Sequence, residues 1–187
     1  MAVNAVDRSN KTVLCWAVYH GDAAAAHALI DARASLTHEA SDGMNPSMRA
    51  TATRRHAVMQ VLIEAKADVN VDRTKKPGAD VQSPLQIAVK NNDCRAGRVL
   101  LDAKAAVEED VKPGDSPLSS AIKSDHEEMV GLLLDAKARV MRSAHMLWTP
   151  AWDNQVAVMK RLIKAKAKLE PTSIEEPPYD SPTPLTA

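Results

Sequence analysis

The side chains of this chain that could take part in catalysis or bind a metal ion are two cysteines and six histidines. Cys15 and His20 lie five residues apart, and a thiol close to a histidine base can act as a nucleophile. The pair falls on one predicted helix and its turn, and we favour the alternative that Cys15 packs, or faces a groove between structural units. None of the histidines has a cysteine or acidic neighbour at a metal-ligand spacing such as Cys-x-x-Cys or His-Glu-x-x-His. The histidines are His20, His27, His38, His56, His126 and His145. We therefore predict no catalytic residue, no metal site and no enzymatic activity.

Glycine-rich segments and net charge narrow the ligand classes further. Gly78 and Gly114 each follow a proline, which is typical of a turn. The sequence has no P-loop and no dinucleotide-binding fingerprint, so we predict no cofactor. The 187 residues include 24 basic and 24 acidic side chains. This balance argues against nucleic acid as the main partner, because proteins that bind nucleic acids usually carry a basic excess.

Cysteine usage and hydropathy bear on the compartment. Cys15 and Cys94 lie far apart and show no pairing pattern, which is typical of reduced thiols in an intracellular protein. Residues 1–7 have neither the basic start nor the apolar core of a signal peptide. No apolar run approaches the about 20 residues that span a membrane. We expect an intracellular, cytoplasmic protein without a membrane span, and the sequence leaves an organelle open.

The cysteines and histidines belong to a chain in which one segment is repeated. One copy reads Leu133-Leu134-Asp135-Ala136-Lys137-Ala138, and each copy pairs two aliphatic residues ahead of an alanine-rich charged stretch. The copies start at Leu29, Leu62, Leu100, Leu133 and Leu162, so they lie 33, 38, 33 and 29 residues apart. A period in the thirties predicts a stacked array of structural repeats.

Each repeat has the pattern of two helices. In the first four copies a small polar residue stands 17 residues before the aliphatic pair, namely Thr12, Asn45, Ser83 and Ser116. Such a residue caps a helix, and a proline after it is tolerated at the first helical position. A helix of about two turns, a polar break and a second helix with helical apolar spacing follow. The breaks are residues 20–22, 54–56, 91–93 and 124–126. Neither helix could bury its apolar face alone, so neighbouring units must stack.

The segments Ser83-Pro84-Leu85, Ser116-Pro117-Leu118 and Ala67-Asp68-Val69-Asn70 resemble the ankyrin repeat. The resemblance covers nearly the whole chain and implies an all-α ankyrin-repeat solenoid with finger loops between units. We expect a single domain over residues 1–187, with units at about 10–42, 43–80, 81–113, 114–146 and 147–180. Residues 2–7 resemble the tail of a unit and residues 183–187 the start of one. We infer partial units at both ends, which indicates either a piece of a longer ankyrin chain or ends that dock on partners.

Two positions depart from the ankyrin pattern throughout. Where the family usually has histidine, this chain has Cys15, Met48, Gln86 and Ser119. We expect some hydrogen bonds between units to be missing and the stack to be softer. Where the family usually has glycine after the second helix, it has Arg33, Lys66, Lys104, Lys137 and Lys166. Glycine usually adopts a left-handed conformation there, so a side chain costs about 1 kcal/mol, partly offset by about 0.3–1 kcal/mol from a cation near a helix C-terminus.

The fifth unit is irregular. Thr149-Pro150 lies only thirteen residues before Leu162. Either the first helix of this unit has lost about a turn, or it starts near His145 and Pro150 kinks it. We favour the shortened helix. Two loops are long, residues 71–80 and 171–180, and each is a tolerated surface insertion or part of a binding face.

The resemblance implies that partners contact the loop tips and the exposed end of each first helix, on the concave face. The corresponding residues here are Tyr19, His20, Asp42, Met44, Gln82, Lys90, Asn91, Lys112, Asp115, Lys123, Ser124, Trp148 and Trp152. Exposed aromatic residues at such a face are typical anchors. Trp148 and Trp152 could equally fill the gap left by a shortened helix, and we expect Trp16 to pack mostly against the next unit. The basic row of Arg33 and the four lysines is a solvated face or a docking strip for an acidic partner or lipid headgroups.

The sequence therefore predicts a protein-binding scaffold or adaptor. One alternative is a structural subunit inside a large multiprotein assembly. Another is the targeting arm of a longer multidomain protein.

Overall fold

The computed structural model describes residues 3–70, 82–107, 116–138 and 150–165. Within these ranges the chain is helical and contains no strand, although one isolated antiparallel bridge joins Val6 and Thr12. The helices are α1 (Val13–His20), α2 (Ala23–Asp31), α3 (Pro46–Ala52), α4 (His56–Glu64), α5 (Pro84–Lys90), α6 (Cys94–Asp102), α7 (Pro117–Lys123), α8 (Glu127–Asp135) and α10 (Val156–Lys164). Residues 150–152, ahead of α10, are helical as well. The predicted all-α class is confirmed.

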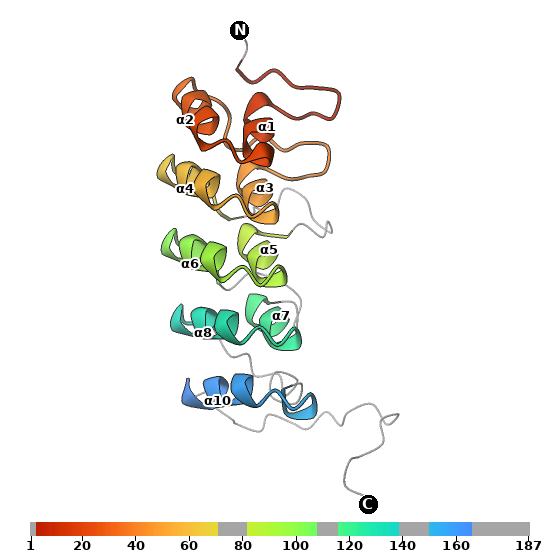
Figure 1. Ribbon diagram of the computed structural model, residues 1–187, viewed down its shortest axis with the longest axis vertical. Coiled ribbons are helices and arrows are strands. Elements are labelled where there is room, and N and C mark those ends of the chain that lie inside the picture. The colour runs from red at the N-terminus through yellow and green to blue at the C-terminus, as the bar shows by residue number, and fades with distance from the viewer. Residues whose placement is uncertain (1–2, 71–81, 108–115, 139–149, 166–187) are drawn as a thin grey trace, which may run out of the picture.

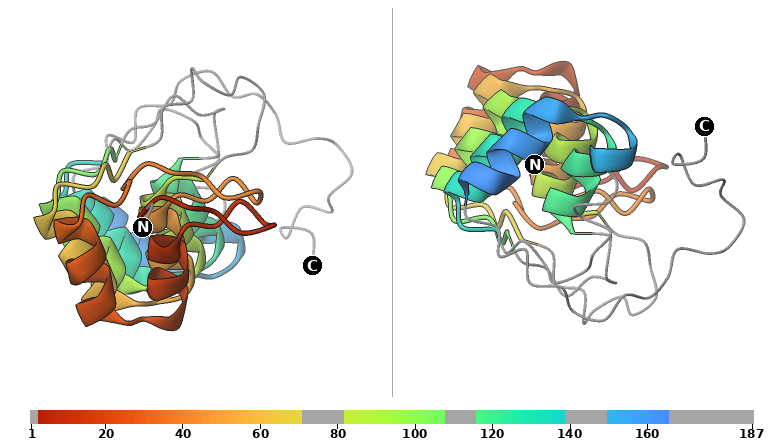
Figure 2. Two further views of the ribbon diagram at one scale, coloured as in Figure 1. Left: turned by 90° about the horizontal axis from the view of Figure 1, so that it is seen from above. Right: turned by 90° about the horizontal axis from the view of Figure 1, so that it is seen from below.

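The helices form two columns that run the length of the molecule. The first helices of successive units, α1, α3, α5 and α7, contact one another in order, and the second helices α2, α4, α6, α8 and α10 do the same. Figure 1 shows one unit per level, and the end-on views of Figure 2 show the two columns as separate layers. The predicted solenoid of helix–turn–helix units is therefore present.

Side-chain caps start the first helices where the sequence predicts them. The side chains of Thr12, Asn45, Ser83 and Ser116 each accept a hydrogen bond from the backbone N–H three residues later. Ser83 and Gln86 form a reciprocal capping box, which satisfies two backbone donors that the helix cannot pair itself. Proline follows the cap in α3, α5 and α7. The small polar residues thus fix where each unit begins.

In each of the first four units, one residue just after the second helix has a left-handed backbone conformation, as predicted. Arg33, Lys66, Lys104 and Lys137 have φ angles of 67°, 58°, 64° and 64°. At each one the next backbone N–H donates to the carbonyl of the leucine of the repeated pair, as from Ala67 N to Leu62 O at 2.9 Å. Lys166 lies outside the described residues.

A second left-handed residue, which the sequence analysis did not identify, sits between the two helices of every unit. The residues are Gly21, Arg54, Asn92, Asp125 and Asn154, with φ between 49° and 80°. The turn is closed by a backbone bond such as Arg55 N to Ala50 O at 2.8 Å. This tight turn brings the end of each first helix next to the start of the second.

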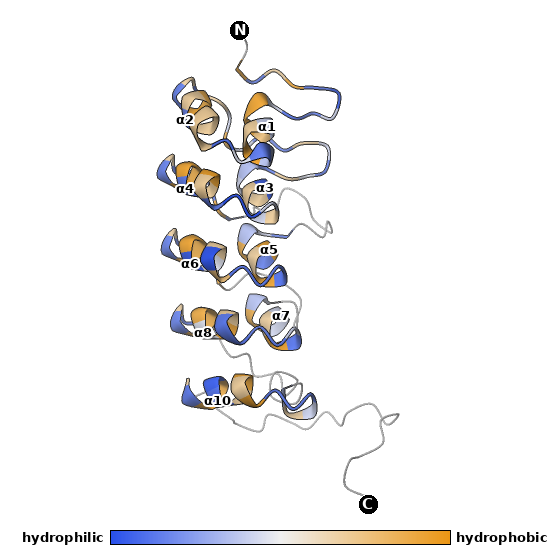
Figure 3. Cartoon of the chain, viewed as in Figure 1, coloured by the Kyte–Doolittle hydropathy of each residue, from blue (hydrophilic) through white to orange (hydrophobic). Residues whose placement is uncertain are grey.

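The core consists of aliphatic residues that face between the columns. Leu14, Leu85 and Leu118 from the first helices and Leu62, Leu100, Leu133 and Leu162 from the second helices are at most 2% exposed. Figure 3 shows apolar residues along the helix bodies and hydrophilic residues at the turns and helix ends. Cys15 is 0% exposed and its sulfur accepts from Thr12 Oγ1 at 3.3 Å, so this cysteine packs in the core rather than lying open beside His20.

The register of the fifth unit follows from its turn. Gln155 N donates to Pro150 O at 2.8 Å, just as His126 N donates to Ala121 O at 2.9 Å one unit earlier. Pro150 therefore occupies the position of Ala121, the fifth residue of α7, and it is buried as Ala121 is. The start of this helix, on which the two alternatives differ, lies outside the described residues.

Candidate protein-binding face

The last turn of every first helix ends at the tight turn, so two positions recur in register along the array. We call these two positions the helix-end row. In unit order the row consists of Tyr19 and His20, Ala52 and Thr53, Lys90 and Asn91, Lys123 and Ser124, and Trp152 and Asp153. Seven of the thirteen predicted partner-binding residues belong to this row.

The row is exposed and begins and ends with an aromatic residue. Tyr19 in the first unit is 47% exposed and Trp152 in the fifth is 59% exposed. His20, Lys90, Lys123 and Ser124 are exposed, and Asn91 is half-buried. Large exposed aromatic side chains are rare in a chain that has only three Trp and two Tyr. Side chains of this type supply most of the free energy at protein interfaces.

The first unit adds a cluster of rings at one end of the row. The Trp16 ring stacks on His20 with centroids 5.9 Å apart, and Tyr19 meets both rings edge-on. Lys11 Nζ lies 4.9 Å from the centre of the Trp16 ring, within the range of a cation–π contact. Trp16 Nε1 donates to Asp7 Oδ2 at 3.0 Å, and bonds from the Lys11 and Trp16 donors lower the pKa of Asp7. The rings are thereby held in place while they stay accessible.

The prediction that Trp16 packs mostly against the next unit is wrong, because its side chain is 40% exposed. The same position is nearly buried in the next two units, where Arg49 is 5% and Ile87 is 8% exposed. Trp16 has a following unit but, among the described helices, none that precedes it. No described helix precedes α1, whereas α3 and α5 each follow the first helix of another unit.

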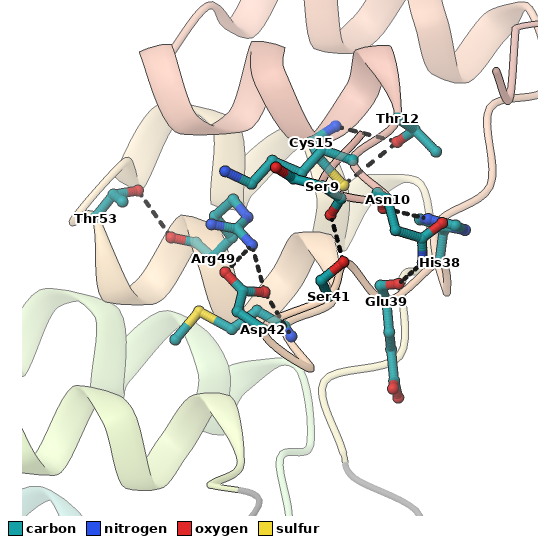
Figure 4. A network of polar contacts seen from close by, with 12 residues as sticks. Ser9, Asn10, Thr12, Cys15, His38, Glu39, Ser41, Asp42, Arg49 and Thr53 are labelled. Carbon is teal, nitrogen blue, oxygen red and sulfur yellow. Dashed lines mark hydrogen bonds and ion pairs between the residues drawn. The ribbon is translucent and has the colours of Figure 1, made fainter. Parts of the chain in front are cut away.

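A polar network joins the loops ahead of α1 and α3, which are the first two finger loops (Figure 4). Ser41 donates to Ser9 O through both its backbone N–H and its hydroxyl, at 3.2 and 2.9 Å. Asn10 Nδ2 donates to Glu39 O at 3.0 Å, and His38 Nε2 lies 2.8 Å from Asn10 O. The two fingers lie side by side at one side of the first helices (Figure 2). We call this set of contacts the finger network.

Arg49 anchors the finger network to α3. Its Nη2 donates to both carboxylate oxygens of Asp42, at 2.8 and 2.7 Å. Burial alone would raise the pKa of Asp42, but the bonds from Arg49 and the Met44 N–H outweigh it and lower that pKa. Asp42 and the half-buried Met44 are predicted partner contacts, and the structure shows both engaged in internal bonds.

The N-terminal tail makes the contact that its resemblance to a unit tail implies. Asn4 Oδ1 accepts from Ser35 N at 2.8 Å. Asn70 Oδ1 accepts a hydrogen bond from Ala106 N at 2.7 Å, which is the equivalent contact between two later units. Residues 3–7 thus take the place of the tail of a unit against the next one.

Side chains of the tight turns connect neighbouring units. Arg55 Nε donates to Tyr19 O at 3.2 Å, and Arg54 Nη2 donates to Asn91 O. His126 Nδ1 lies 2.9 Å from Val89 O. The sequence does not predict these bonds, although Arg54, Arg55 and His126 belong to the polar breaks between the helices. They supply hydrogen bonds between units at a place other than the first-helix position where the ankyrin pattern has histidine.

His56 and Asp93 form the most buried of these contacts. His56 Nε2 lies 2.7 Å from Asp93 Oδ2, and Asp93 is 5% exposed. Asp93 also caps α6 by accepting from Ala96 N at 3.0 Å. Burial tends to raise the pKa of Asp93, but the Ala96 and His56 bonds dominate and lower it.

Four predicted partner-binding residues belong neither to the helix-end row nor to the finger network. Gln82 is half-buried ahead of α5, and Lys112, Asp115 and Trp148 lie outside the described residues. Where side chains are placed, no group of three His, Cys, Asp or Glu residues could hold a metal ion. Among the helices described above, none is long and apolar enough to cross a membrane.

Comparison with known proteins agrees with this geometry. Residues 71–144 match the family model of ankyrin repeats, in three copies. This matched segment is therefore similar to ankyrin repeats. The solved structure of an ankyrin repeat domain from Acinetobacter baumannii AYE superimposes with a TM-score of 0.76, covers 90% of this chain and 88% of its own, and is 23% identical. The array thus has the ankyrin-repeat fold that the resemblance implied. No curated protein matches the sequence.

Ankyrin repeats are generally modules of protein–protein interaction, and the placement of side chains in this array is consistent with that role. The helix-end row exposes two large aromatic side chains, Tyr19 and Trp152, and aromatic side chains are common anchors at interfaces. Cys15 and His20 lie five residues apart in the sequence, but Cys15 is buried and His20 is exposed.

Proposed function

We propose that this ankyrin array is a scaffold that binds a protein partner through the helix-end row and the finger loops. The observation that carries the proposal is the exposure of Tyr19 and Trp152 at the two ends of one row. A folded chain gains stability by burying such side chains, so leaving them exposed favours a contact with another molecule. Polar residues at these positions would be enough to keep a folded array in solution.

The proposed compartment is intracellular, in the cytoplasm. The two cysteines are unpaired, Cys15 being buried and Cys94 half-buried. Burial raises the pKa of the Cys94 thiol, which keeps it in its less reactive protonated form. Free thiols of this kind suit a reducing environment.

The test is an affinity pull-down from native extract, followed by mass spectrometry and size fractionation. The bait is compared with a variant in which Tyr19, Trp148 and Trp152 are changed to alanine. We expect several substoichiometric partners with the unmodified chain and their loss with the variant. A matched control changes Val156, which is 52% exposed but belongs to α10 and not to the row, to alanine and should keep the partners. Partners that survive the triple change would show that the binding face lies elsewhere.

A second candidate, a structural subunit of a large assembly, is favoured by exposed apolar residues at the two ends of the stack. Val13 is 50% exposed at one end, and Ile163 is 56% exposed at the other. Neighbouring subunits could cover these surfaces. Co-migration in one large particle at fixed stoichiometry would favour this candidate over the scaffold. A targeting arm of a longer protein remains a third proposal, tested by the sequence of the full transcript.

A further inference from the structure

The first leucine of the repeated segment is covered differently in the first unit than in the later ones. In the second to fifth units this leucine is 0% exposed, namely at Leu62, Leu100, Leu133 and Leu162. Leu29, the equivalent residue of α2, is half-buried. Each of α4, α6, α8 and α10 contacts the second helix of the unit before it, whereas no second helix is described before α2. The side of α2 on which a preceding helix would pack is therefore uncovered, and we call it the open face of the first unit.

Ala25 lies on the same open face. It is half-buried, whereas its equivalents in the later units are 0% exposed, namely Val58, Ala96, Met129 and Val158. A Cβ atom at Gly97 of α6 would lie 3.1 Å from the sulfur of Met129 in α8. The position of Met129 in its unit thus packs directly against the position of Gly97 in the unit before. Ala25 has no such neighbour among the described helices.

The fifth unit has the complementary uncovered face, on α10 at the opposite end of the second-helix column (Figure 1). Met159 is equivalent to Gly97 and is half-buried, whereas this position is buried in the first four units, at Ala26, Met59, Gly97 and Val130. Ile163 is 56% exposed, and its equivalents are half-buried, namely Ile30, Ile63, Leu101 and Leu134. We call this side of α10 the open face of the fifth unit.

The two open faces are the two halves of a contact that already joins the units of one chain. By the register of the repeat, the Gly97 position of one unit pairs with the Met129 position of the next. Between the second and third units this register pairs Met59 with Ala96, and both are at most 1% exposed. Placing the fifth unit of one copy before the first unit of another would pair Met159 with Ala25. The same combination of one methionine and one alanine fits the close packing of a protein interior.

We propose that the open face of the fifth unit of one copy packs on the open face of the first unit of a second copy, so that chains associate end to end. The contact continues the second-helix column from one chain into the next. Burial of Leu29, Ala25 and Ile163 supplies the driving force. Residues 3–7 already make the tail contact of a preceding unit, through Asn4 and Ser35, so the second copy supplies its helices.

This inference goes beyond the proposed function and does not depend on it. Lys90 stays exposed although its unit has neighbours on both sides. Stacking of units therefore leaves the helix-end row accessible to a protein partner. End-to-end association would place several such rows in one particle.

The first test measures the mass of the full chain in solution. Sedimentation velocity is recorded from about 5 µM to about 500 µM, a range suited to weak contacts. We expect the average mass to rise with concentration and to pass that of a dimer, because a contact between two different faces leaves one of each free in every complex. A monomer throughout this range, or growth that stops at a dimer, would overturn the end-to-end contact.

A substitution at Ala28 tests the open face of the first unit. Ala28 is exposed, and its equivalent Arg161 lies against the preceding unit, where a Cβ atom at Gly131 would lie 2.7 Å from Arg161 Nη1. In the joined copies residue 28 faces Lys160, which is equivalent to Gly131. We expect Ala28→Arg to weaken association at least tenfold, because like charges then meet across the contact.

The matched control for this substitution is Ala24→Arg in the same helix. Its position is exposed in every unit, namely at Ala24, Ala57, Arg95, Glu128 and Ala157. The control should associate as the unmodified chain does. Circular dichroism melting curves confirm that both variants fold. Equal weakening by the two arginines would show that the open face of the first unit is not the contact.

A mixing experiment tests whether two different faces meet. Ile163→Lys blocks the open face of the fifth unit, and Ala157→Lys is its control at an exposed position of α10. Ala28→Arg and Ile163→Lys should each stay monomeric at concentrations where the unmodified chain associates. An equimolar mixture of the two should form a dimer that grows no further, since each variant keeps one intact face. A mixture that stays monomeric would overturn the pairing of these two faces.

The failure of this inference and that of the proposed function are distinguishable. A chain that stays monomeric but captures partners in the extract pull-down would overturn end-to-end association and leave the scaffold standing. A chain that associates end to end but captures no other protein would support this inference and refute the scaffold.

Discussion

The finger network precedes the first helices and the helix-end row ends them, and their polar side chains are used differently. In the finger network, Asp42, Arg49 and Ser41 form hydrogen bonds within the chain. In the helix-end row, Tyr19, Lys90 and Trp152 project into solvent. The sequence predicts partner contacts at Asp42 and Met44 of the second finger loop as well as in the row. The structure shows that the first region builds the scaffold, and the exposed second region is the better candidate for recognition.

The difference teaches how a repeat array separates stability from recognition. Each unit contacts only its neighbours, so bonds between units must hold the stack together. Those bonds come from the fingers and the tight turns. At the ends of α1 and α5, Tyr19 and Lys90 are exposed, so we expect these side chains to vary without loss of packing.

The largest expected effect is at Arg49, which is 5% exposed and holds Asp42. Changing Arg49 to alanine should lower the free energy of unfolding by about 2–4 kcal/mol, because it removes a buried side chain and breaks a charged pair. Urea denaturation followed by circular dichroism measures the change. The control Arg98→Ala, at an exposed position of α6, should stay within about 0.5 kcal/mol. Equal effects of the two changes would mean that the finger network does not build the scaffold.

The next effect concerns Asp93, which both caps α6 and binds His56. Asp93→Ala should cost about 2 kcal/mol through the lost cap and the lost bond. Asp93→Asn keeps a cap and should cost about 1 kcal/mol. The two variants are compared by urea denaturation near neutral pH.

The pH dependence of this difference follows from the lowered pKa of Asp93. A lowered pKa in the folded state stabilises the fold above the unfolded-state pKa of about 3.9. The contribution is lost as the pH falls through the folded value. The stability gap between the unmodified chain and Asp93→Asn should therefore be constant from about pH 6 to about pH 5 and should shrink below about pH 4. A gap that persists at the lowest pH would assign the effect to packing rather than to the charge.

A smaller effect of opposite sign is expected at Lys104, where φ is 64°. Lys104→Gly should raise the free energy of unfolding by up to about 1 kcal/mol, because glycine adopts this conformation without strain. Arg95→Gly, at an exposed position within α6, should lower it by about 1 kcal/mol. If Lys104→Gly were destabilising, the cation would be contributing more at the helix end than its left-handed conformation costs.

The smallest effect on stability is expected in the helix-end row. Tyr19→Ala and Lys90→Ala should each change the free energy of unfolding by no more than about 0.5 kcal/mol, as exposed substitutions usually do. The same variants should reduce the capture of partners severalfold in the pull-down from native extract. Strong destabilisation without a binding defect would reverse the contrast between the two regions.

The sequence alone determined the repeat, the helix starts and the left-handed residues after the second helices. These features depend on short-range chemistry. A Ser or Thr hydroxyl reaches the N–H groups of its own helix, and a chain reversal after a helix requires the left-handed region whatever the residue. Hence Ser83 and Lys104 could be assigned from their neighbours in the sequence. The pairing of residues 3–7 with the next unit could be predicted in the same way, because Asn4 stands where Asn70 stands in a later repeat.

Only the tertiary structure decided which side chains stay exposed and which connect units. Trp16 and Arg49 occupy the same position of the repeat, yet Trp16 is exposed, whereas Arg49 is buried and pairs with Asp42. The bonds from Arg55 to Tyr19 and from His56 to Asp93 join residues 36 and 37 positions apart. A repeat pattern fixes the position of a residue within its unit, but burial and hydrogen bonding depend on what the neighbouring units place against it.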